Sequence, residues 1–333
     1  MEYDTDPAFS APQSCGEVIT GGLAAGTYYV HCKATDTNPA GEAAEIVIGY
    51  SADQTETGDG AIHVTAAPDA HGSITLSEDT LSPGGDMLVT IRPEDGYLLD
   101  AIFVNDEEVP LHGRFTRRGL TSDTRIEVRF VPRPSEAEWK NLFKDVSERD
   151  WFFDDVSYAC RSRWMNGVAE DRFDLKMPLN RAAFVTVLYR FDLMPESPES
   201  SFTDVPDNTW HTEAVGWASD AGIVNGVGHS QYAPLDDITR EQMAAILYRY
   251  MNYRGLDVSA KDDADLSGFI DADEIYDYAA DAVRWAVGCG LLQGRGNGVL
   301  APRGTATRAE VATVFHRLEA VVKAAEALAA DPA

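Results

Sequence analysis

Positive charge is scarce in this sequence. It has 27 Lys and Arg residues against 55 Asp and Glu residues, which gives a formal net charge of -28. A surface this acidic repels nucleic acid and anionic lipid, so neither is expected as a general partner. Any anion that the protein binds therefore requires a local positive feature. The sequence also lacks an apolar run long enough to span a membrane.

Cysteine and the common catalytic motifs are equally sparse. No pair of cysteines has C-x-x-C spacing, so a zinc site is not expected. The sequence has no H-E-x-x-H, no Gly-rich phosphate loop and no Gly-x-Ser-x-Gly, which predicts that this stretch is not an enzyme. Cys15 and Cys32 pair across a hairpin in one interpretation. In the other, all four cysteines are small thiols: Cys15, Cys32, Cys160 and Cys289.

The first residues, 1–10, are acidic and lack the basic and apolar regions of a signal peptide. The chain is then either cytoplasmic or an internal piece of a longer secreted protein, and the second interpretation is favoured because the first domain begins partway through. Residues 1–58 contain two strand-like runs, 26–34 and 44–50, with a turn composition between them. This segment looks like the last hairpin of an immunoglobulin-like sandwich.

Residues 59–133 are predicted to form a small all-β unit. Strands are expected at 62–66, 73–76, 87–92, 98–104 and 125–131, with turns at Ser82-Pro-Gly-Gly and Glu94-Asp-Gly. With Gly72-Ser-Ile-Thr and the closing Ile126-Glu-Val-Arg-Phe, the unit resembles the divergent internalin-type B-repeats of bacterial surface proteins, which are usually spacers. Residues 134–140 form a linker.

After residue 140 the apolar pattern changes to a helical period, and three copies of one unit follow. The copies span 141–200, 201–262 and 263–322, and residues 323–333 form a tail. Each copy opens with a Phe-x-Asp motif, and its second helix begins at an arginine and carries apolar residues at i, i+3, i+4 and i+7. Three such stripes predict one shared core. The Phe-x-Asp pairs are Phe143 and Asp145, Phe202 and Asp204, and Phe269 and Asp271; the arginines are Arg181, Arg240 and Arg308.

These copies resemble S-layer homology repeats, most closely at Ala301-Pro-Arg-Gly-Thr-Ala-Thr-Arg-Ala-Glu-Val. The resemblance implies an all-α, pseudo-threefold domain that follows the all-β modules. It implies secretion and non-covalent anchoring at the bacterial cell surface. The implied partner is a peptidoglycan-linked secondary cell-wall polysaccharide, often pyruvylated, bound as a carbohydrate ligand in grooves between repeats.

The start of each second helix is the predicted anion site. Thr239 with Gln242, and Thr307 with Glu310, form capping boxes. An arginine at the first helical position faces the positive end of the helix dipole, an unfavourable placement by roughly 0.3–1 kcal/mol that suggests another use. Free backbone amides plus a guanidinium group suit a carboxylate or phosphate. The alternative is that each arginine pairs internally, for example with the aspartate of its own or a neighbouring Phe-x-Asp.

Aromatic and loop residues complete the candidate glycan site. Trp151 and Trp210 either stack on sugars or pack in the core, and Tyr278 replaces tryptophan in the third copy. Loops end in Asn166-Gly167, Asn225-Gly226 or Gln293-Gly294, which turn the chain and offer amides. In the first copy Ala183 replaces the capping acid and Arg163-Trp164 replaces Gly-Ile or Gly-Leu, so its groove is expected to differ. The candidate glycan-binding residues are Arg181, Arg240, Arg308, Asp145, Asp204, Asp271, Trp151, Trp210, Asn225, Gly226, Gln293 and Gly294.

Residues 263–274 match an EF-hand calcium loop in pattern. Two features oppose calcium binding: no helix is expected to run into the first position, and Phe269 and Asp271 belong to the repeat. No metal or other cofactor is therefore expected. The loop donors are Asp263, Asp265, Ser267, Asp271 and Glu274.

Two other functions remain open from sequence. One is a structural or adhesive surface protein with self-assembly or calcium-linked contacts. The other is an enzyme whose catalytic domain lies upstream.

Overall fold

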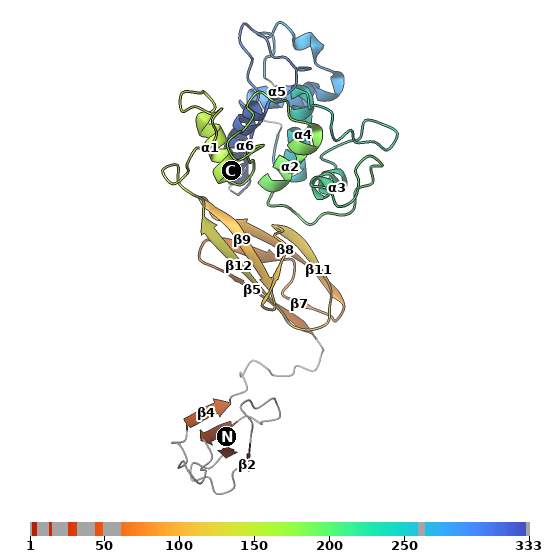
Figure 1. The fold of residues 1–333 in the computed structure, drawn as a ribbon. Coiled ribbons are helices and arrows are strands. Elements are labelled where there is room, and N and C mark those ends of the chain that lie inside the picture. The colour runs from red at the N-terminus through yellow and green to blue at the C-terminus, as the bar shows by residue number, and fades with distance from the viewer. Residues whose placement is uncertain are drawn as a thin grey trace. The chain divides into compact units, whose positions relative to one another are not determined.

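The computed structural model of the chain describes residues 61–258 and 264–330, together with four short strands near the N-terminus (Figure 1). Met1–Gly60 and Ala61–Ala333 are separate compact units. In the first unit, β1 (Glu2–Asp4), β2 (Gln13–Ser14), β3 (Gly26–His31) and β4 (Ala44–Ile48) form an antiparallel sheet in the order β2-β1-β3-β4. The predicted strand pair is present as β3 and β4, whereas Cys15 and Cys32 lie outside the described residues.

Residues 62–132 form a two-sheet β module. One sheet has the order β10-β9-β12-β5-β7 and the other β11-β8-β6. The only parallel pair described in this module is β12 with β5. Side chains from both sheets, among them Met87, Ile102 and Ile126, fill the space between them. The strands are β5 (Ile62–Pro68), β6 (Gly72–Leu76), β7 (Thr80–Leu81), β8 (Gly85–Pro93), β9 (Tyr97–Val104), β10 (Glu107–Val109), β11 (Arg114–Leu120) and β12 (Thr124–Pro132).

All five strands expected for the module are present, and the sequence missed β7, β10 and β11. The sequence Arg-Phe-Thr-Arg-Arg-Gly-Leu of β11 has one buried apolar side chain, Phe115. It therefore lacks the alternation that identifies a strand, and only its pairing with β8 reveals it.

The described residues within 141–330 form loops and helices, with two principal helices in each copy. The first helices are α1 (Phe153–Arg161), α3 (Thr212–Asp220) and α5 (Ala280–Gly288), and α5 is preceded by two short 3-10 turns, η2 (Ala272–Glu274) and η3 (Asp277–Ala279). The second helices are α2 (Arg181–Phe191), α4 (Arg240–Tyr253) and α6 (Arg308–Ala330). No helix in the described parts of the chain is both long and apolar enough to cross a membrane.

The predicted shared core is confirmed. Phe191 of α2 packs against Phe315 of α6 at 5.7 Å and against Tyr250 of α4 at 6.0 Å between ring centroids. All three copies contribute to one hydrophobic cluster. The helical stripes of the three copies thus pack into one core.

The segments that precede the second helices are hydrogen-bonded in a closed ring. The backbone N–H of Leu179 donates to Ala306 O at 2.9 Å, that of Ala306 to Ile238 O at 3.0 Å, and that of Ile238 back to Leu179 O at 2.9 Å. Each copy thus donates one bond to a second copy and accepts one from the third. This ring fixes the starts of α2, α4 and α6 relative to one another.

Candidate glycan grooves between the repeats

Each motif arginine begins its helix, as predicted. α2, α4 and α6 start at Arg181, Arg240 and Arg308. The capping boxes are also present: Thr239 and Gln242 bond reciprocally, and Glu310 N donates to Thr307 Oγ1 while Thr307 N donates to Glu310. In the first copy one half of the capping box is present: the Asn180 side chain accepts a hydrogen bond from Ala183 N.

The prediction that free amides at these helix starts bind an anion is wrong. Arg181 N donates to Asp236 O, and Arg240 N donates to Gly304 O. Arg308 N donates in the same way to Met177 O. Carbonyl oxygens of another copy therefore occupy the donors that a ligand needs, because the repeats are packed together at this end of the helices.

The guanidinium groups reach sideways to a neighbouring copy. Arg181 donates to the carbonyl oxygens of Tyr232 and Asn225 at 3.0 and 3.1 Å. Arg240 does the same to Leu300 and Gln293 at 3.0 and 2.5 Å, and Arg308 to Phe173 and Asn166 at 2.6 and 2.5 Å. Every motif arginine thus clamps the loop that ends in Asn-Gly or Gln-Gly in the adjacent copy. Arg181 is 7% exposed and Arg240 is 4% exposed.

Two of these arginines line open cavities between copies. We call the cavity of about 270 Å³ beside Arg181 the Arg181 groove and the one of about 420 Å³ beside Arg240 the Arg240 groove. The Arg181 groove is lined by Arg181, Val224, Asn225, Gly226, Val227, Gln242, Ala245, Ile246, Arg249 and Tyr278. The Arg240 groove is lined by Trp151, Arg240, Leu291, Gln293, Gly294, Arg295, Glu310, Thr313, Val314 and Arg317.

Both grooves share one composition. Each combines the motif arginine of one copy with the loop and second helix of the next copy and an aromatic residue of the third. The aromatic residue is Tyr278 in the Arg181 groove and Trp151 in the Arg240 groove. Trp151 is 67% exposed and Trp210 is 60% exposed, so neither packs in the core. Trp210 lies against His211, and its position in the second copy corresponds to that of Trp151 in the first.

Electrostatics separate the two grooves. Arg181 forms no ion pair with a carboxylate in the parts of the chain that the structure describes, and it lies over the Tyr232 ring at 4.6 Å. Arg240 pairs with Glu310 at 3.2 Å, and Glu310 also pairs with Arg295 at 2.7 Å. Burial lowers the pKa of Arg240, and it would raise that of Glu310, but hydrogen bonds from Arg295 and Thr307 keep the pKa of this carboxyl below its usual value.

The three motif aspartates hold loops and do not touch the arginines directly. Both carboxylate oxygens of Asp204 accept backbone N–H groups, from Tyr232 and Ala233, each at 2.8 Å. The same pairs of bonds join Asp145 to Phe173 and Asp174, and Asp271 to Leu300 and Ala301. Direct pairing of arginine with aspartate is therefore not found among the described residues. The internal pairing that the sequence left open is present in another form, because Arg240 pairs with Glu310 and all three arginines donate to backbone carbonyl oxygens.

The loop glycines are required by close packing. A Cβ atom on Gly226 would lie 2.5 Å from Gln231 O and 2.7 Å from the Phe202 ring, and one on Gly294 would lie 2.9 Å from Phe269. Neither glycine has a positive φ angle. The expected turn role is thus replaced by a contact with the phenylalanine of Phe-x-Asp.

Sequence reasoning missed a second set of arginines. Arg249 lines the Arg181 groove and Arg317 lines the Arg240 groove. Arg190 stands at the same position of α2 and donates to Trp164 O at 3.4 Å. The sequence does contain a pattern that identifies them, because in every copy an arginine follows the motif arginine at the same spacing.

The calcium-loop residues are dispersed. Asp263 lies outside the described residues. Asp265 accepts from Ser267 N and Oγ, and both oxygens of Asp271 accept backbone N–H groups. Helix α4 ends at Tyr253 and so does not run into the loop. Among the described residues no cluster of three or more His, Cys, Asp or Glu side chains is placed to hold a metal ion.

Comparison with known proteins agrees with this geometry. The family model of the S-layer homology domain matches residues 201–244 and 268–312. The chain is 30% identical over 182 residues to an amylopullulanase of Thermoanaerobacterium thermosulfurigenes, and 29% identical over 188 residues to exoglucanase XynX of Acetivibrio thermocellus. It is 28% identical over 156 residues to the surface-layer 125 kDa protein of Lysinibacillus sphaericus.

The alignments cover 54%, 56% and 46% of this chain but only 10%, 17% and 13% of those relatives. The enzymes and the surface-layer protein therefore share with this chain a small part of their length. The matched segments coincide with the second and third helical copies. Residues 201–244 and 268–312 are thus similar to the S-layer homology domain.

Proposed function

We propose that the helical repeats anchor a bacterial surface protein, without covalent attachment, to an anionic polysaccharide of the cell wall. The ligand lies in the grooves between repeats, and a pyruvyl or other acidic group on the glycan faces the arginines. Catalysis has no part in this role. The β modules act as spacers between the anchor and the remainder of the protein.

The observation that carries the proposal is the repeated composition of the two grooves. The Arg181 groove has two arginines and the Arg240 groove has three, and each groove has a loop amide residue and an exposed aromatic ring, drawn from three different copies. Carboxylates are bound by guanidinium groups through charge-assisted hydrogen bonds, and sugars stack on aromatic faces. In a chain of net charge -28, these clusters are the local positive features that an anionic ligand needs.

We also infer that the three copies are arranged around a pseudo-threefold axis. The closed hydrogen-bond ring of Leu179, Ala306 and Ile238 supports this, as do the equivalent clamps made by the three motif arginines. Such an arrangement presents three related grooves on one body. Their side chains differ, so their affinities are expected to differ as well.

Arg249 and Arg317 give the sharpest test, because the motif arginines also hold the fold. We expect the double variant Arg249→Gln, Arg317→Gln to lose binding to cell-wall sacculi about tenfold or more, as expected for charge-assisted contacts. The matched control is Arg284→Gln, an exposed arginine that pairs with Asp281 on the surface of α5. Binding is measured by co-sedimentation with sacculi before and after acid extraction of the attached glycan.

Retention on extracted sacculi would contradict the proposal, because the polysaccharide would then be dispensable. So would equal binding by the double variant and the control. Thermal unfolding of each variant, followed by circular dichroism, establishes that the fold is intact.

A further inference from the structure

The β module is fixed to the helical repeats by backbone hydrogen bonds. Gly113 N donates to Leu193 O at 2.6 Å, and Glu196 N donates to Arg114 O at 2.7 Å. Thr116 N donates to the Glu196 carboxylate at 2.8 Å. The segment between the first and second copies therefore runs along the free edge of β11.

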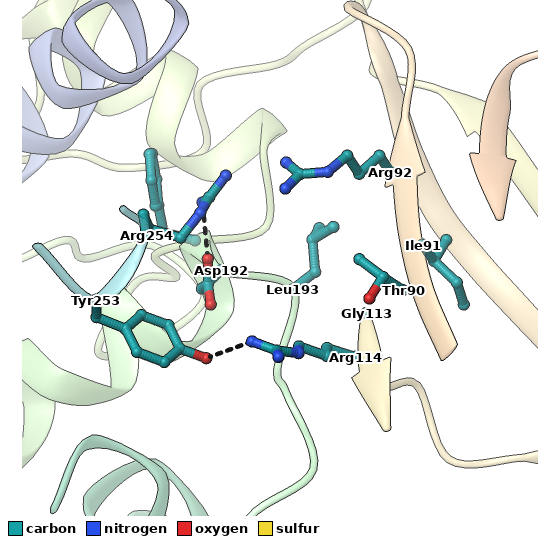
Figure 2. Close-up of a pocket in the computed structure, with 10 residues that line it drawn as sticks. Thr90, Ile91, Arg92, Gly113, Arg114, Asp192, Leu193, Tyr253 and Arg254 are labelled. Atoms are coloured by element: carbon teal, nitrogen blue, oxygen red, sulfur yellow. Dashed lines mark hydrogen bonds and ion pairs between the residues drawn. The ribbon is translucent and has the colours of Figure 1, made fainter. Parts of the chain in front are cut away.

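Two cavities open at this junction, and both are lined by Arg114 and Tyr253. Figure 2 shows the smaller one. Their volumes are about 250 and 550 Å³. We call the two cavities together the junction cleft. The smaller cavity adds Thr90, Ile91, Arg92, Gly113, Phe191, Asp192, Leu193 and Arg254; the larger adds Leu88, Phe115, Thr116, Arg118, Pro195, Glu196, Ser197, Pro198, Trp217, Asp220 and Ala221.

The cleft is lined by four arginines and three carboxylates: Arg92, Arg114, Arg118 and Arg254, and Asp192, Glu196 and Asp220. Figure 2 shows Arg92 and Arg114 extending from the β module towards Tyr253, the last residue of α4, and Arg254, the residue after it. Arg254 forms an ion pair with Asp192 at 2.9 Å, and Arg92 forms one with Glu326 at 3.1 Å. Arg114 has no carboxylate partner among the described residues and makes a single 3.4 Å contact with the Tyr253 hydroxyl.

The wall opposite Arg114 is aromatic. Tyr253 packs edge-on to Trp217 with ring centroids 6.0 Å apart. Trp217 lines the larger cavity and is 3% exposed, and its indole N–H has no acceptor in the part of the chain that the structure describes. Trp217 therefore places an aromatic wall and an indole N–H without an acceptor beside the larger cavity.

We propose that the junction cleft is a second binding site, separate from the grooves, for an acidic oligosaccharide. A carboxylate of the ligand pairs with Arg114, and a sugar ring lies against Tyr253. Arg114 is the unpaired cation that selects for negative charge. An acidic peptide fits less well, because the edge of β11 that a peptide strand would join already pairs with residues 193–196. Binding here links the β module to the wall together with the repeats.

The test uses the full chain with Arg249→Gln and Arg317→Gln, so that the grooves do not dominate. The probe is tetragalacturonate, a sugar chain with one carboxylate per ring, titrated by calorimetry and by NMR of the tryptophan indole N–H groups. We expect saturable binding that shifts the Trp217 resonance, assigned with Trp217→Phe. Affinity should fall at least tenfold in Arg114→Gln and decrease as salt is added.

Arg117→Gln is the matched control, because it removes the same charge from the same strand without lining either cavity. Maltotetraose tests the need for charge, and tetraglutamate tests the need for sugar. Unchanged affinity in Arg114→Gln, equal losses in both arginine variants, or equal affinity for maltotetraose or tetraglutamate would each overturn the proposal. A Trp217 resonance that stays fixed at saturation would do so too. Because Arg114→Gln and Arg117→Gln are compared in the same background with weakened grooves, failure here leaves the proposed anchoring function standing.

Discussion

The phenol of Tyr278 donates a hydrogen bond to Glu241 Oε1 at 3.1 Å, and Tyr276 N donates to the other oxygen of the same carboxylate at 3.1 Å. Glu241 is the second residue of α4, is 2% exposed, and belongs to a different copy from the two tyrosines. The carboxylate thus orients the aromatic residue of the Arg181 groove. Burial and the neighbouring carboxylate raise the pKa of Tyr278, so its hydroxyl remains a donor at neutral pH.

Glu241→Gln should weaken glycan binding in the Arg181 groove several-fold, because an amide accepts through one oxygen and cannot hold both donors. The free energy of unfolding should fall by about 1–3 kcal/mol. Calorimetry with the purified wall polysaccharide and urea unfolding measure the two effects. Tyr278→Phe removes one of the two bonds and should give a smaller loss of stability; an unchanged affinity in both variants would remove Glu241 from the site.

Arg181→Lys should destabilise the fold by about 1–3 kcal/mol although the charge is kept. An ammonium group cannot bridge Tyr232 O and Asn225 O as the planar guanidinium does. Urea unfolding measures the change against Arg284→Lys, which replaces an exposed arginine. Equal stability of the two variants would show that the clamp contributes nothing.

Asp204→Asn should make the fold less stable at neutral pH and less sensitive to acid. Burial opposes the ionised form of Asp204, but the N–H groups of Tyr232 and Ala233 outweigh it and lower the pKa of the carboxyl. A lowered folded-state pKa means that the stabilisation is complete above the unfolded-state pKa of about 3.9 and is lost as the pH falls through the folded-state value. The measurement is the urea midpoint between pH 7 and pH 2. If the urea midpoint of the variant fell with pH as it does in the wild type, Asp204 would not be a source of the acid sensitivity.

Gly226→Ala should destabilise the second copy by about 1–3 kcal/mol, because the new methyl group overlaps Gln231 O and Phe202. Gly268→Ala is the control, since a Cβ there meets nothing within 4 Å. Thermal unfolding distinguishes them. Similar melting temperatures for both variants would show that the loop moves aside easily.

Metal removal should leave anchoring unchanged. Asp271 uses both oxygens to hold the backbone of Leu300 and Ala301, and Asp265 is bonded to Ser267. We therefore expect the same retention on sacculi in about 1 mM EDTA and in about 1 mM added calcium, a concentration at which extracellular calcium sites are occupied. Retention that requires calcium would favour the alternative of calcium-linked contacts.

Periodicity predicted most of the architecture. The five predicted strands of the β module lie within observed strands, and the helices begin at the arginines that the repeats marked. Local pattern succeeds here because apolar spacing and capping residues act over a few neighbouring positions. It failed at β11, where arginines occupy the positions that normally alternate with apolar residues.

The sequence predicted several residues of the candidate site, but it was wrong about the backbone amides at the helix starts. Two motif arginines, Arg181 and Arg240, and the exposed tryptophan Trp151 do line a groove, whereas the helix-start amides are taken by carbonyl oxygens. Those carbonyls belong to another copy, and nothing in the local sequence indicates that they approach. Arg114 and Trp217 were not singled out for the same reason, because their cleft exists only where the β module meets the repeats.

The sequence alone determined that three related helical units follow β-rich modules, and that each unit places an arginine at the start of a helix. Only the tertiary structure decided which copy each arginine serves. The ring through Leu179, Ala306 and Ile238 turns every guanidinium group towards its neighbour's loop, and the aromatic ring of the third copy closes the groove. These are contacts between residues far apart in the chain, which packing fixes and local sequence preference does not.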